Sequence, residues 1–132
     1  MQINAITGVI VKCAMRVHSR LGPGVLESSY EACLAYELQK VGLLVERQVP
    51  LPIYYDEIRL DVGYRIDLLV ENEVVVEIKA QESILPVHHA QILSHLRLSG
   101  RTVGLLINFH EVSLKNGITR KVNHYKEPAN SA

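Results

Sequence analysis

Apolar residues in the first part of the chain recur with the period of an α-helix. Over residues 3–21 they fall within one arc of roughly 100°, which predicts an amphipathic helix that faces a core. Gly22-Pro23-Gly24 follows directly, and glycine with proline after a last turn is typical of a helix end. A second apolar arc over residues 25–41 predicts another helix, which stops at Gly42. The chain therefore begins with two consecutive helices.

Strand patterns follow, and prolines interrupt the first of them. Residues 43–55 carry strand-forming side chains, but Pro50 and Pro52 sit at alternate positions, so their missing donors face the same side. This arrangement indicates an edge strand or a bulge. Asp56-Glu57 then predicts a turn.

The next two strands form a hairpin in this prediction. Residues 58–70 predict one strand, with a bulge near Asp61 and Gly63, and residues 74–79 predict the next. The polar segment Glu71-Asn72-Glu73 joins them as a short turn.

The last part of the chain predicts a helix, a buried strand and a small hairpin. Residues 83–99 predict the helix, with Ser83 as its N-cap and Pro86 in its first turn. Residues 102–109 form a continuous apolar run, as expected of a central strand covered on both faces. Asn116-Gly117 predicts a hairpin turn within residues 112–123. The order predicts an α/β fold in which helices flank a mixed β-sheet, with a parallel crossover near its end.

Composition narrows the class of protein. A chain of 132 residues with 48% hydrophobic residues fits one globular domain, which we expect over residues 1–126, with a disordered tail over residues 127–132. The net charge of zero argues against non-specific coating of nucleic acid, which needs a basic excess. No apolar run is long enough to span a bilayer and the start lacks a signal-peptide pattern, so we expect a cytoplasmic protein. We expect Cys13 and Cys33 to be reduced core thiols.

Three charged residues interrupt the hydrophobic hairpin. Asp67 lies on its first strand, and Glu77 and Lys79 lie on its second. Because burial of an unpaired charge costs several kcal/mol, the three must have partners, and two carboxylates beside an ammonium suggest a metal site. A three-residue loop at residues 71–73 would place Asp67 opposite Glu77 on one face. A shift of one residue would send Glu77 to the other face, so the site requires this register.

Other charged residues on the helices have less specific interpretations. Glu27 points into the apolar arc near the start of the second helix, where the helix dipole favours an anion. Glu37 also falls in that arc but lies about 15 Å further along the axis, so we expect it to form a separate ion pair. A basic stripe on the first helix is either a solvated face or a surface for phosphate (Lys12, Arg16, Arg20).

The chain resembles the GxxExxY proteins. The segment Gly24-Val-Leu-Glu27-Ser-Ser-Tyr30 fits the motif that names them. The resemblance covers about residues 3–123 and continues through further segments in the same order (His18-Ser-Arg-Leu-Gly-Pro-Gly, Gly63-Tyr-Arg-Ile-Asp67, Glu77-Ile-Lys79, His88-His-Ala-Gln91, Gly104-Leu-Leu-Ile-Asn-Phe). GxxExxY proteins are placed in the PD-(D/E)xK nuclease-like superfamily. The resemblance therefore implies a restriction-endonuclease-like αβββαβ core, here with an extra N-terminal helix and a C-terminal hairpin.

The resemblance also implies roles for individual residues. Asp67, Glu77 and Lys79 match the superfamily pattern, Glu27 matches the helix Glu that often completes the metal shell, and Gln91 matches an assisting Gln on the following helix. The chain departs from the pattern at Ile66, where many members have Pro.

These residues suit metal-assisted phosphodiester hydrolysis of DNA or RNA. Glu27, Asp67 and Glu77, with the Ile78 carbonyl, offer oxygen ligands suited to Mg²⁺ or Mn²⁺, which would activate a water. Lys79 would position that water or stabilise the phosphate oxygens. Tyr30, one turn after Glu27, would either pack in the core or support the site by hydrogen bonding.

Three hypotheses from different classes remain at this point. The first is a metal-dependent nuclease, for which the superfamily implies a homodimer. The second is a catalytically inactive module on the same fold that binds nucleic acid or protein. The third is a zinc site or another metalloenzyme that uses histidines of the third helix (His88, His89, His95), although no Cys joins them.

Overall fold

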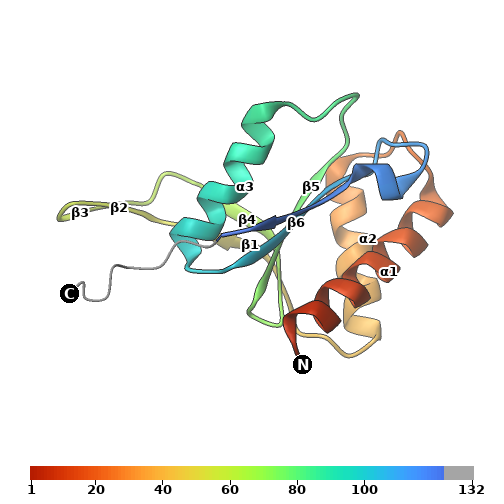
Figure 1. Ribbon diagram of the computed structural model, residues 1–132, viewed down its shortest axis with the longest axis horizontal. Helices are drawn as coiled ribbons and strands as arrows, with labels where there is room; N and C mark the ends of the chain where they lie inside the picture. Colours follow the sequence, from red (N-terminus) through yellow and green to blue (C-terminus); the bar gives the residue numbers. More distant parts are fainter. Residues whose placement is uncertain (124–132) are drawn as a thin grey trace.

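The computed structural model describes residues 1–123, and the tail expected from residue 127 lies outside the described residues. Five strands form one mixed sheet in the order β1-β4-β5-β6-β7, of which Figure 1 labels the first four. The α-helices are α1 (Ile3–Leu21), α2 (Glu27–Lys40) and α3 (Pro86–Ser99), and η1 (Leu114–Gly117) is a short 3₁₀ helix. The strands of this sheet are β1 (Val45–Pro50), β4 (Arg65–Val70), β5 (Val74–Lys79), β6 (Val103–Asn108) and β7 (Ile118–Val122). The predicted mixed α/β fold is confirmed, and the elements of the main sheet and its helices follow one another as α2-β1-β4-β5-α3-β6, which is the expected αβββαβ order.

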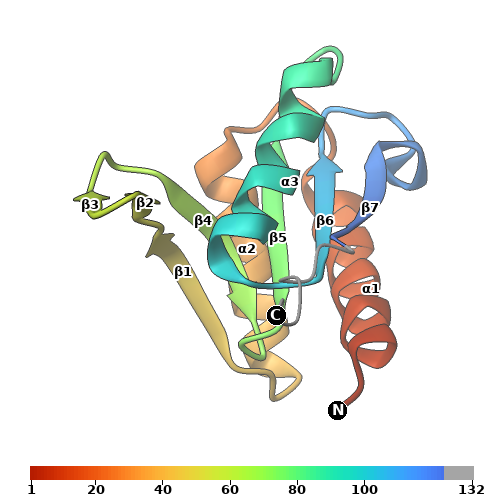
Figure 2. The same ribbon diagram turned by 60° about the vertical axis from the view of Figure 1, so that its left-hand side comes forward.

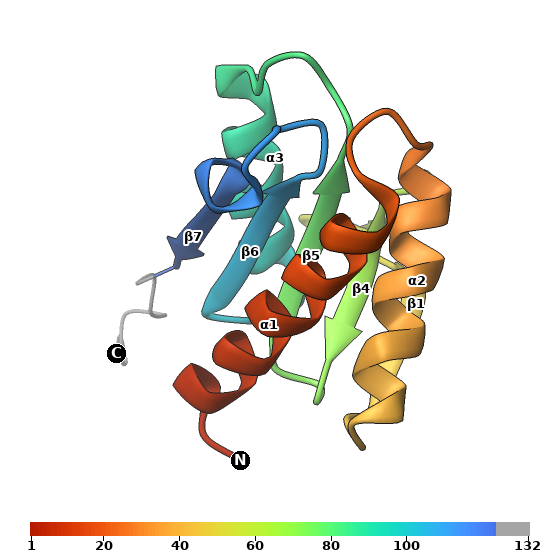
Figure 3. The same ribbon diagram turned by 90° about the vertical axis from the view of Figure 1, so that its right-hand side faces the viewer.

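Helices cover both faces of the sheet. Helices α1 and α2 pack on one face and α3 on the other, as Figures 2 and 3 show. The side chains of β5 alternate between the two layers: Val74 and Val76 join the core under α1 and α2, while Val75 joins the core under α3. Burial on both faces explains why four of the six residues of this strand are apolar. None of the helices in the described residues combines the length and apolar composition needed to cross a membrane.

The predicted register of the β4–β5 hairpin is confirmed. Leu68 pairs with Val76 and Val70 with Val74, so residues 71–73 form the loop, and the same register continued by one residue sets residue 67 against residue 77. Glu71 and Asn72 both have positive φ, and asparagine tolerates that conformation better than most residues. The turn therefore fixes the arrangement on which the expected site depends.

The carboxyl ends of β5 and β6 lie at one edge of the sheet. The two strands are parallel, as expected for a strand–helix–strand unit, and Lys79 pairs with Asn108 at their ends. The buried Asn108 side chain accepts a hydrogen bond from Gln81 N–H (3.0 Å) and donates one to Gln81 C=O (2.8 Å). These bonds hold the chain in place where it leaves β5. The loop between α1 and α2 reaches the same edge (Figure 3).

The prediction of one strand over residues 58–70 is wrong. Residues 61–64 are irregular, and Ile58–Leu60 forms β3, which pairs with β2 (Ile53–Tyr55) as a separate two-stranded sheet. This β2–β3 arm projects away from the main sheet (Figure 1). Gly63, with φ of 89°, marks the change of direction that ends the arm before β4 begins.

The start of α3 and the pairing of the C-terminal strand also differ from the prediction. Helix α3 begins at Pro86 and its N-cap is Leu85 rather than Ser83. His88 Nδ1 accepts the Leu85 N–H (2.9 Å), which is the role that a Glu or Gln at this position of the first turn has in a capping box. Residues 112–123 do not form a local hairpin, because Asn116-Gly117 lies in η1 and β7 pairs antiparallel with β6.

Candidate active site at the carboxyl end of strand β5

The Asp67 carboxylate lies where β4 and β5 separate. The paired residues of the ladder end at Leu68 and Val76, and the next donor, Ile78 N–H, bonds Asp67 Oδ2 at 2.8 Å. Asp67 Oδ1 also accepts a hydrogen bond from Gln48 Nε2 at 3.3 Å. A carboxylate thus occupies the position where strand pairing stops, which opens the sheet beside the end of β5.

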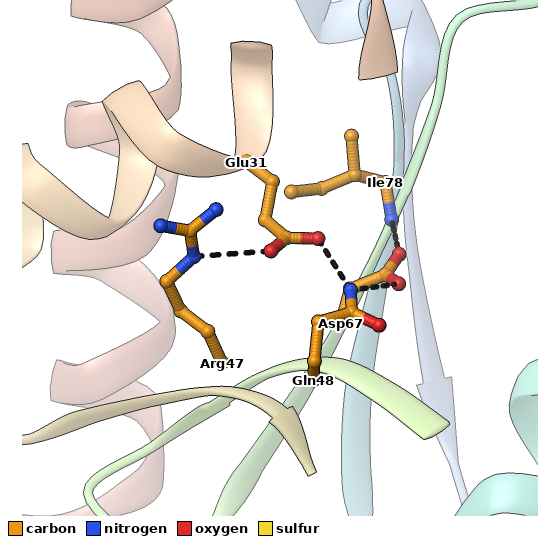
Figure 4. A network of polar contacts seen from close by, with 5 residues as sticks. All are labelled: Glu31, Arg47, Gln48, Asp67 and Ile78. Atoms are coloured by element: carbon orange, nitrogen blue, oxygen red, sulfur yellow. Dashed lines mark hydrogen bonds and ion pairs between the residues drawn. The ribbon is translucent and has the colours of Figure 1, made fainter. Parts of the chain in front are cut away.

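Helix α2 supports Asp67 through Gln48 (Figure 4). Glu31 is buried, with 6% of its surface exposed, and its carboxylate accepts hydrogen bonds from Gln48 Nε2 (2.7 Å) and Arg47 Nε (3.0 Å). Gln48 has a φ of 52°, and the β1–β4 register pairs the residues on either side of it with the residues on either side of Asp67. This network was not predicted from the sequence. Its signal was the four-residue spacing of Glu27 and Glu31, which places both carboxylates on one face of α2.

The Glu77 carboxylate is buried against helix α3. Its Oε2 lies 2.7 Å from His95 Nδ1, and both side chains are largely shielded from solvent. The pKa of Glu77 is raised to about 7, chiefly by burial. The hydrogen bond from His95 lowers the pKa of Glu77, and the negative charge of Asp67 raises it further. The charge of Lys79 lowers the pKa of Glu77. Asp67 and Lys79 are therefore both close enough to influence the Glu77 carboxylate.

The contact of His95 with Glu77 was not predicted from the sequence either. His95 follows Gln91 by four residues, so the two side chains share a face of α3. Both line a groove between α3 and the base of the β2–β3 arm. Gln91 thus lies on the same side of the sheet as Glu77, while the contact of His95 with Glu77 links the groove to the strand end.

Glu27 and Tyr30 hold the α1–α2 loop against the same edge of the sheet. Glu27 Oε2 accepts a hydrogen bond from Ala80 N–H at 3.1 Å, directly after Lys79. The Tyr30 ring is fully buried and stacks on Phe109, with ring centroids 4.4 Å apart. The Tyr30 hydroxyl donates to Gly22 C=O and accepts from Val25 N–H. These contacts support the packing interpretation of Tyr30.

The structure does not gather the expected metal shell into one cluster. Within residues 1–123, no group of three His, Cys, Asp or Glu side chains is arranged to hold a metal ion. Glu27 is engaged by Ala80 N–H, and the helix α3 histidines do not form the alternative zinc site. The smaller donor set of Asp67, Glu77 and the Ile78 carbonyl still suits Mg²⁺, which commonly uses one or two carboxylates and keeps several waters. The repulsion between Asp67 and Glu77, which contributes to the raised pKa of Glu77, is what a cation would relieve.

The remaining charged and thiol groups have structural explanations. Glu37 is buried and forms ion pairs with Arg16 (3.9 Å) and Lys40 (3.7 Å), as expected of a residue remote from the site. The Arg16 pairing engages part of the basic stripe of α1 within the fold. Cys13 is buried, Cys33 is half-buried, and both are free thiols.

Comparison with known families gives one match. Residues 4–121 match the family described as the PD-(D/E)XK nuclease superfamily. The match spans nearly all of the described chain. Comparisons with curated proteins and with solved structures gave no match.

Proposed function

The chain belongs to the PD-(D/E)XK nuclease superfamily, and we propose from this premise that it is a metal-dependent nuclease that hydrolyses phosphodiester bonds in DNA or RNA. The observation that supports the proposal is the β4–β5 register, whose last pair, Leu68 with Val76, is followed on the two strands by Asp67 and Glu77, with Lys79 two residues further along β5. This is the order and spacing of the superfamily motif, and it lies at an open end of strand pairing.

Asp67, Glu77 and the Ile78 carbonyl would hold Mg²⁺ or Mn²⁺ in this proposal. The bound cation would stabilise negative charge on the phosphate and make an attacking water more acidic. Glu27 would serve the site either as the third carboxylate or through its bond to Ala80 N–H, which fixes the backbone beyond Lys79.

The protein's own side chains supply orientation and charge. Lys79 would stabilise the phosphate oxygens or position the water, since it lies two residues beyond Glu77 on β5 and its charge acts on that carboxylate. Gln91 faces the groove beside His95 and would orient the water or the substrate through its amide. Tyr30 would act indirectly, by fixing the loop that carries Glu27.

The motif Gly24–Tyr30 supports membership in the GxxExxY group within the superfamily. Its Glu and Tyr have complementary structural tasks: Glu27 binds the backbone after β5, and Tyr30 stacks on the residue that follows β6. Homodimerisation and a cytoplasmic location stay predictions.

A second candidate function is a catalytically inactive binding module on the same fold. The absence of a three-ligand group in residues 1–123 and the net charge of zero favour it. An inactive module would bind Mn²⁺ or nucleic acid without turnover.

A cleavage panel separates the two functions. Single-stranded, duplex and branched DNA and RNA are incubated with Mn²⁺ and the wild-type protein, Lys79→Ala, Asp67→Ala or Lys115→Ala. If the protein is a nuclease, the wild type should cleave at least one substrate. Lys115→Ala, which removes an exposed lysine of η1, is the control and should cleave it as well. Cleavage should fall by orders of magnitude in the other two variants. No cleavage of any substrate, with normal Mn²⁺ binding, would establish the inactive module instead.

A further inference from the structure

Beside the candidate active site lies a groove of about 370 Å³. Helix α3 forms one wall, and the base of the β2–β3 arm forms the other. The lining residues are Ile53, Tyr64, Val87, Ala90, Gln91, Ser94, His95 and Leu98. The volume falls within the roughly 300–1,000 Å³ typical of small-ligand sites. The groove is therefore of a size to accept one flat, drug-sized group rather than a helix or a strand.

The walls have the chemistry that recognises a nucleobase. Tyr64 presents half of its surface to solvent, which leaves ring area available for stacking. Gln91 and Ser94, three residues apart on α3, offer an amide and a hydroxyl that can bond the edge of a base. The lining contains no Asp, Glu, Lys or Arg, so it lacks the cations that would attract a phosphate instead.

His95 joins this groove to the candidate active site. Its ring lines the groove, and its Nδ1 hydrogen bonds Glu77 at 2.7 Å. A base in the groove would consequently lie next to the carboxylates proposed to act on the phosphodiester. We propose that the groove is a subsite for one unpaired nucleobase of the strand that is cleaved, an inference that rests on the proposed function.

The shape of the groove requires that the bound base be unpaired. A base within a duplex is stacked on both faces and paired at its edge, so it cannot enter a walled groove without leaving the helix. Single strands expose their bases, and stacking on aromatic side chains is the common way in which proteins hold them. The subsite therefore selects single-stranded DNA or RNA, or a nucleotide turned out of a duplex.

Binding measured without metal tests the subsite separately from cleavage. In EDTA, fluorescence anisotropy compares a labelled oligothymidylate, an oligouridylate, a duplex, and an abasic deoxyribose-phosphate strand of equal length. The wild type should bind at least one of the two single strands more tightly than the duplex and the abasic strand, which has the same charge. The affinities for oligothymidylate and oligouridylate, compared with each other, show whether the groove prefers DNA or RNA.

Variants of the groove sharpen the result. Tyr64→Ala should weaken single-strand binding on the order of tenfold, while Tyr64→Phe, which keeps the ring, should bind as the wild type does. Ala90→Met should also weaken binding, because it fills the groove from an exposed position on α3. Tyr36→Ala is the matched control, since Tyr36 is 60% exposed but lies on α2 across the sheet.

Several outcomes would overturn the subsite. Equal affinity for the abasic strand would mean that phosphates alone are recognised. Unchanged single-strand affinity in both Tyr64→Ala and Ala90→Met would exclude the groove. Loss of a dimer in Tyr64→Ala, with strand affinity unchanged, would assign the groove to a second copy of the chain. Failure of the wild type to cleave any substrate contradicts the proposed function, whereas loss of base preference in a cleaving protein contradicts the subsite alone.

Discussion

His95 Nδ1 lies 2.7 Å from Glu77 Oε2, so a helix α3 side chain fixes the carboxylate at the centre of the candidate site. The contact uses only one oxygen of Glu77 and thereby orients the group. Mutation of a partner that orients a metal-binding side chain typically lowers metal affinity or activity by roughly 10–100-fold. His95 is in this account a positioning residue for Glu77.

Replacement of His95 tests that role. Asn places its amide nitrogen close to the position of Nδ1, whereas Gln places its own nearer to Nε2. We therefore expect His95→Asn to bind Mn²⁺ nearly as the wild type does, and His95→Gln and His95→Ala to bind about 10–100-fold more weakly. Isothermal titration calorimetry measures the affinities. Wild-type affinity in His95→Ala would show that the contact is structural only.

Stability should depend on pH through Glu77. Its pKa rises from 4.5 to about 7 on folding, so between these values the folded state holds more protons than the unfolded state. The free energy of unfolding should therefore fall as pH rises from about 4.5 to about 7, by at most about 3 kcal/mol from this group. Urea denaturation in EDTA at pH 5 and pH 8 measures the change.

Glu77→Gln provides the control for this dependence, because it removes the titrating group. The variant should lose most of the decrease between pH 5 and pH 8. Mg²⁺ should raise the wild-type melting temperature more at pH 8 than at pH 5.5, since the cation competes with the proton for Glu77. An equal decrease in the wild type and in Glu77→Gln would assign the pH dependence to other residues.

The register of the β4–β5 hairpin could be predicted from the sequence, but the partners of the charged residues could not. Asn72 at the centre of a short polar loop favours the positive φ that the turn adopts, and the alternation of side chains then determines the face of Glu77. Gln48 reaches Asp67 because β1 lies next to β4, a choice of neighbour that local patterns do not reveal.

The errors at the arm and the C-terminus have a similar cause. Residues 58–70 have strand-forming composition throughout, so the break at residues 61–64 depends on Gly63 and on how the arm leaves the sheet. Asn116-Gly117 does form a turn, but it lies in η1. Strand β7 then pairs along five residues with β6 and not with residues 112–115. Close packing also matters there, because a Cβ on Gly117 would collide with the Asn108 carbonyl oxygen.

The buried Glu31 network should contribute to stability. Glu31→Ala leaves Arg47 and Gln48 without their shared acceptor, and we expect a loss of about 1–3 kcal/mol in the free energy of unfolding. Glu73→Ala, at an exposed position of the hairpin loop, should change it by less than about 0.5 kcal/mol. Chemical denaturation of both variants gives the comparison. Equal effects would mean that the network contributes little.

Tyr30 should matter for folding rather than for chemistry. Tyr30→Phe keeps the stacking on Phe109 and loses the hydroxyl bonds to Gly22 and Val25, so we expect about 1 kcal/mol of destabilisation. Tyr30→Ala should cost about 3–5 kcal/mol, as expected for a buried aromatic ring. Thermal denaturation measures both. A large drop in Mn²⁺ affinity for a stably folded Tyr30→Phe would instead give the hydroxyl a direct role.

The central claim is that Asp67 and Glu77 together hold one divalent cation. Calorimetric titration of the wild type, Asp67→Asn, Glu77→Gln and Lys79→Ala with Mn²⁺ at pH 8 tests it most directly. We expect one Mn²⁺ per chain in the wild type, loss of that binding in the two carboxylate variants, and retention of it in Lys79→Ala. Mn²⁺ binding that is unchanged by both carboxylate substitutions, or absent from the wild type, would contradict the claim.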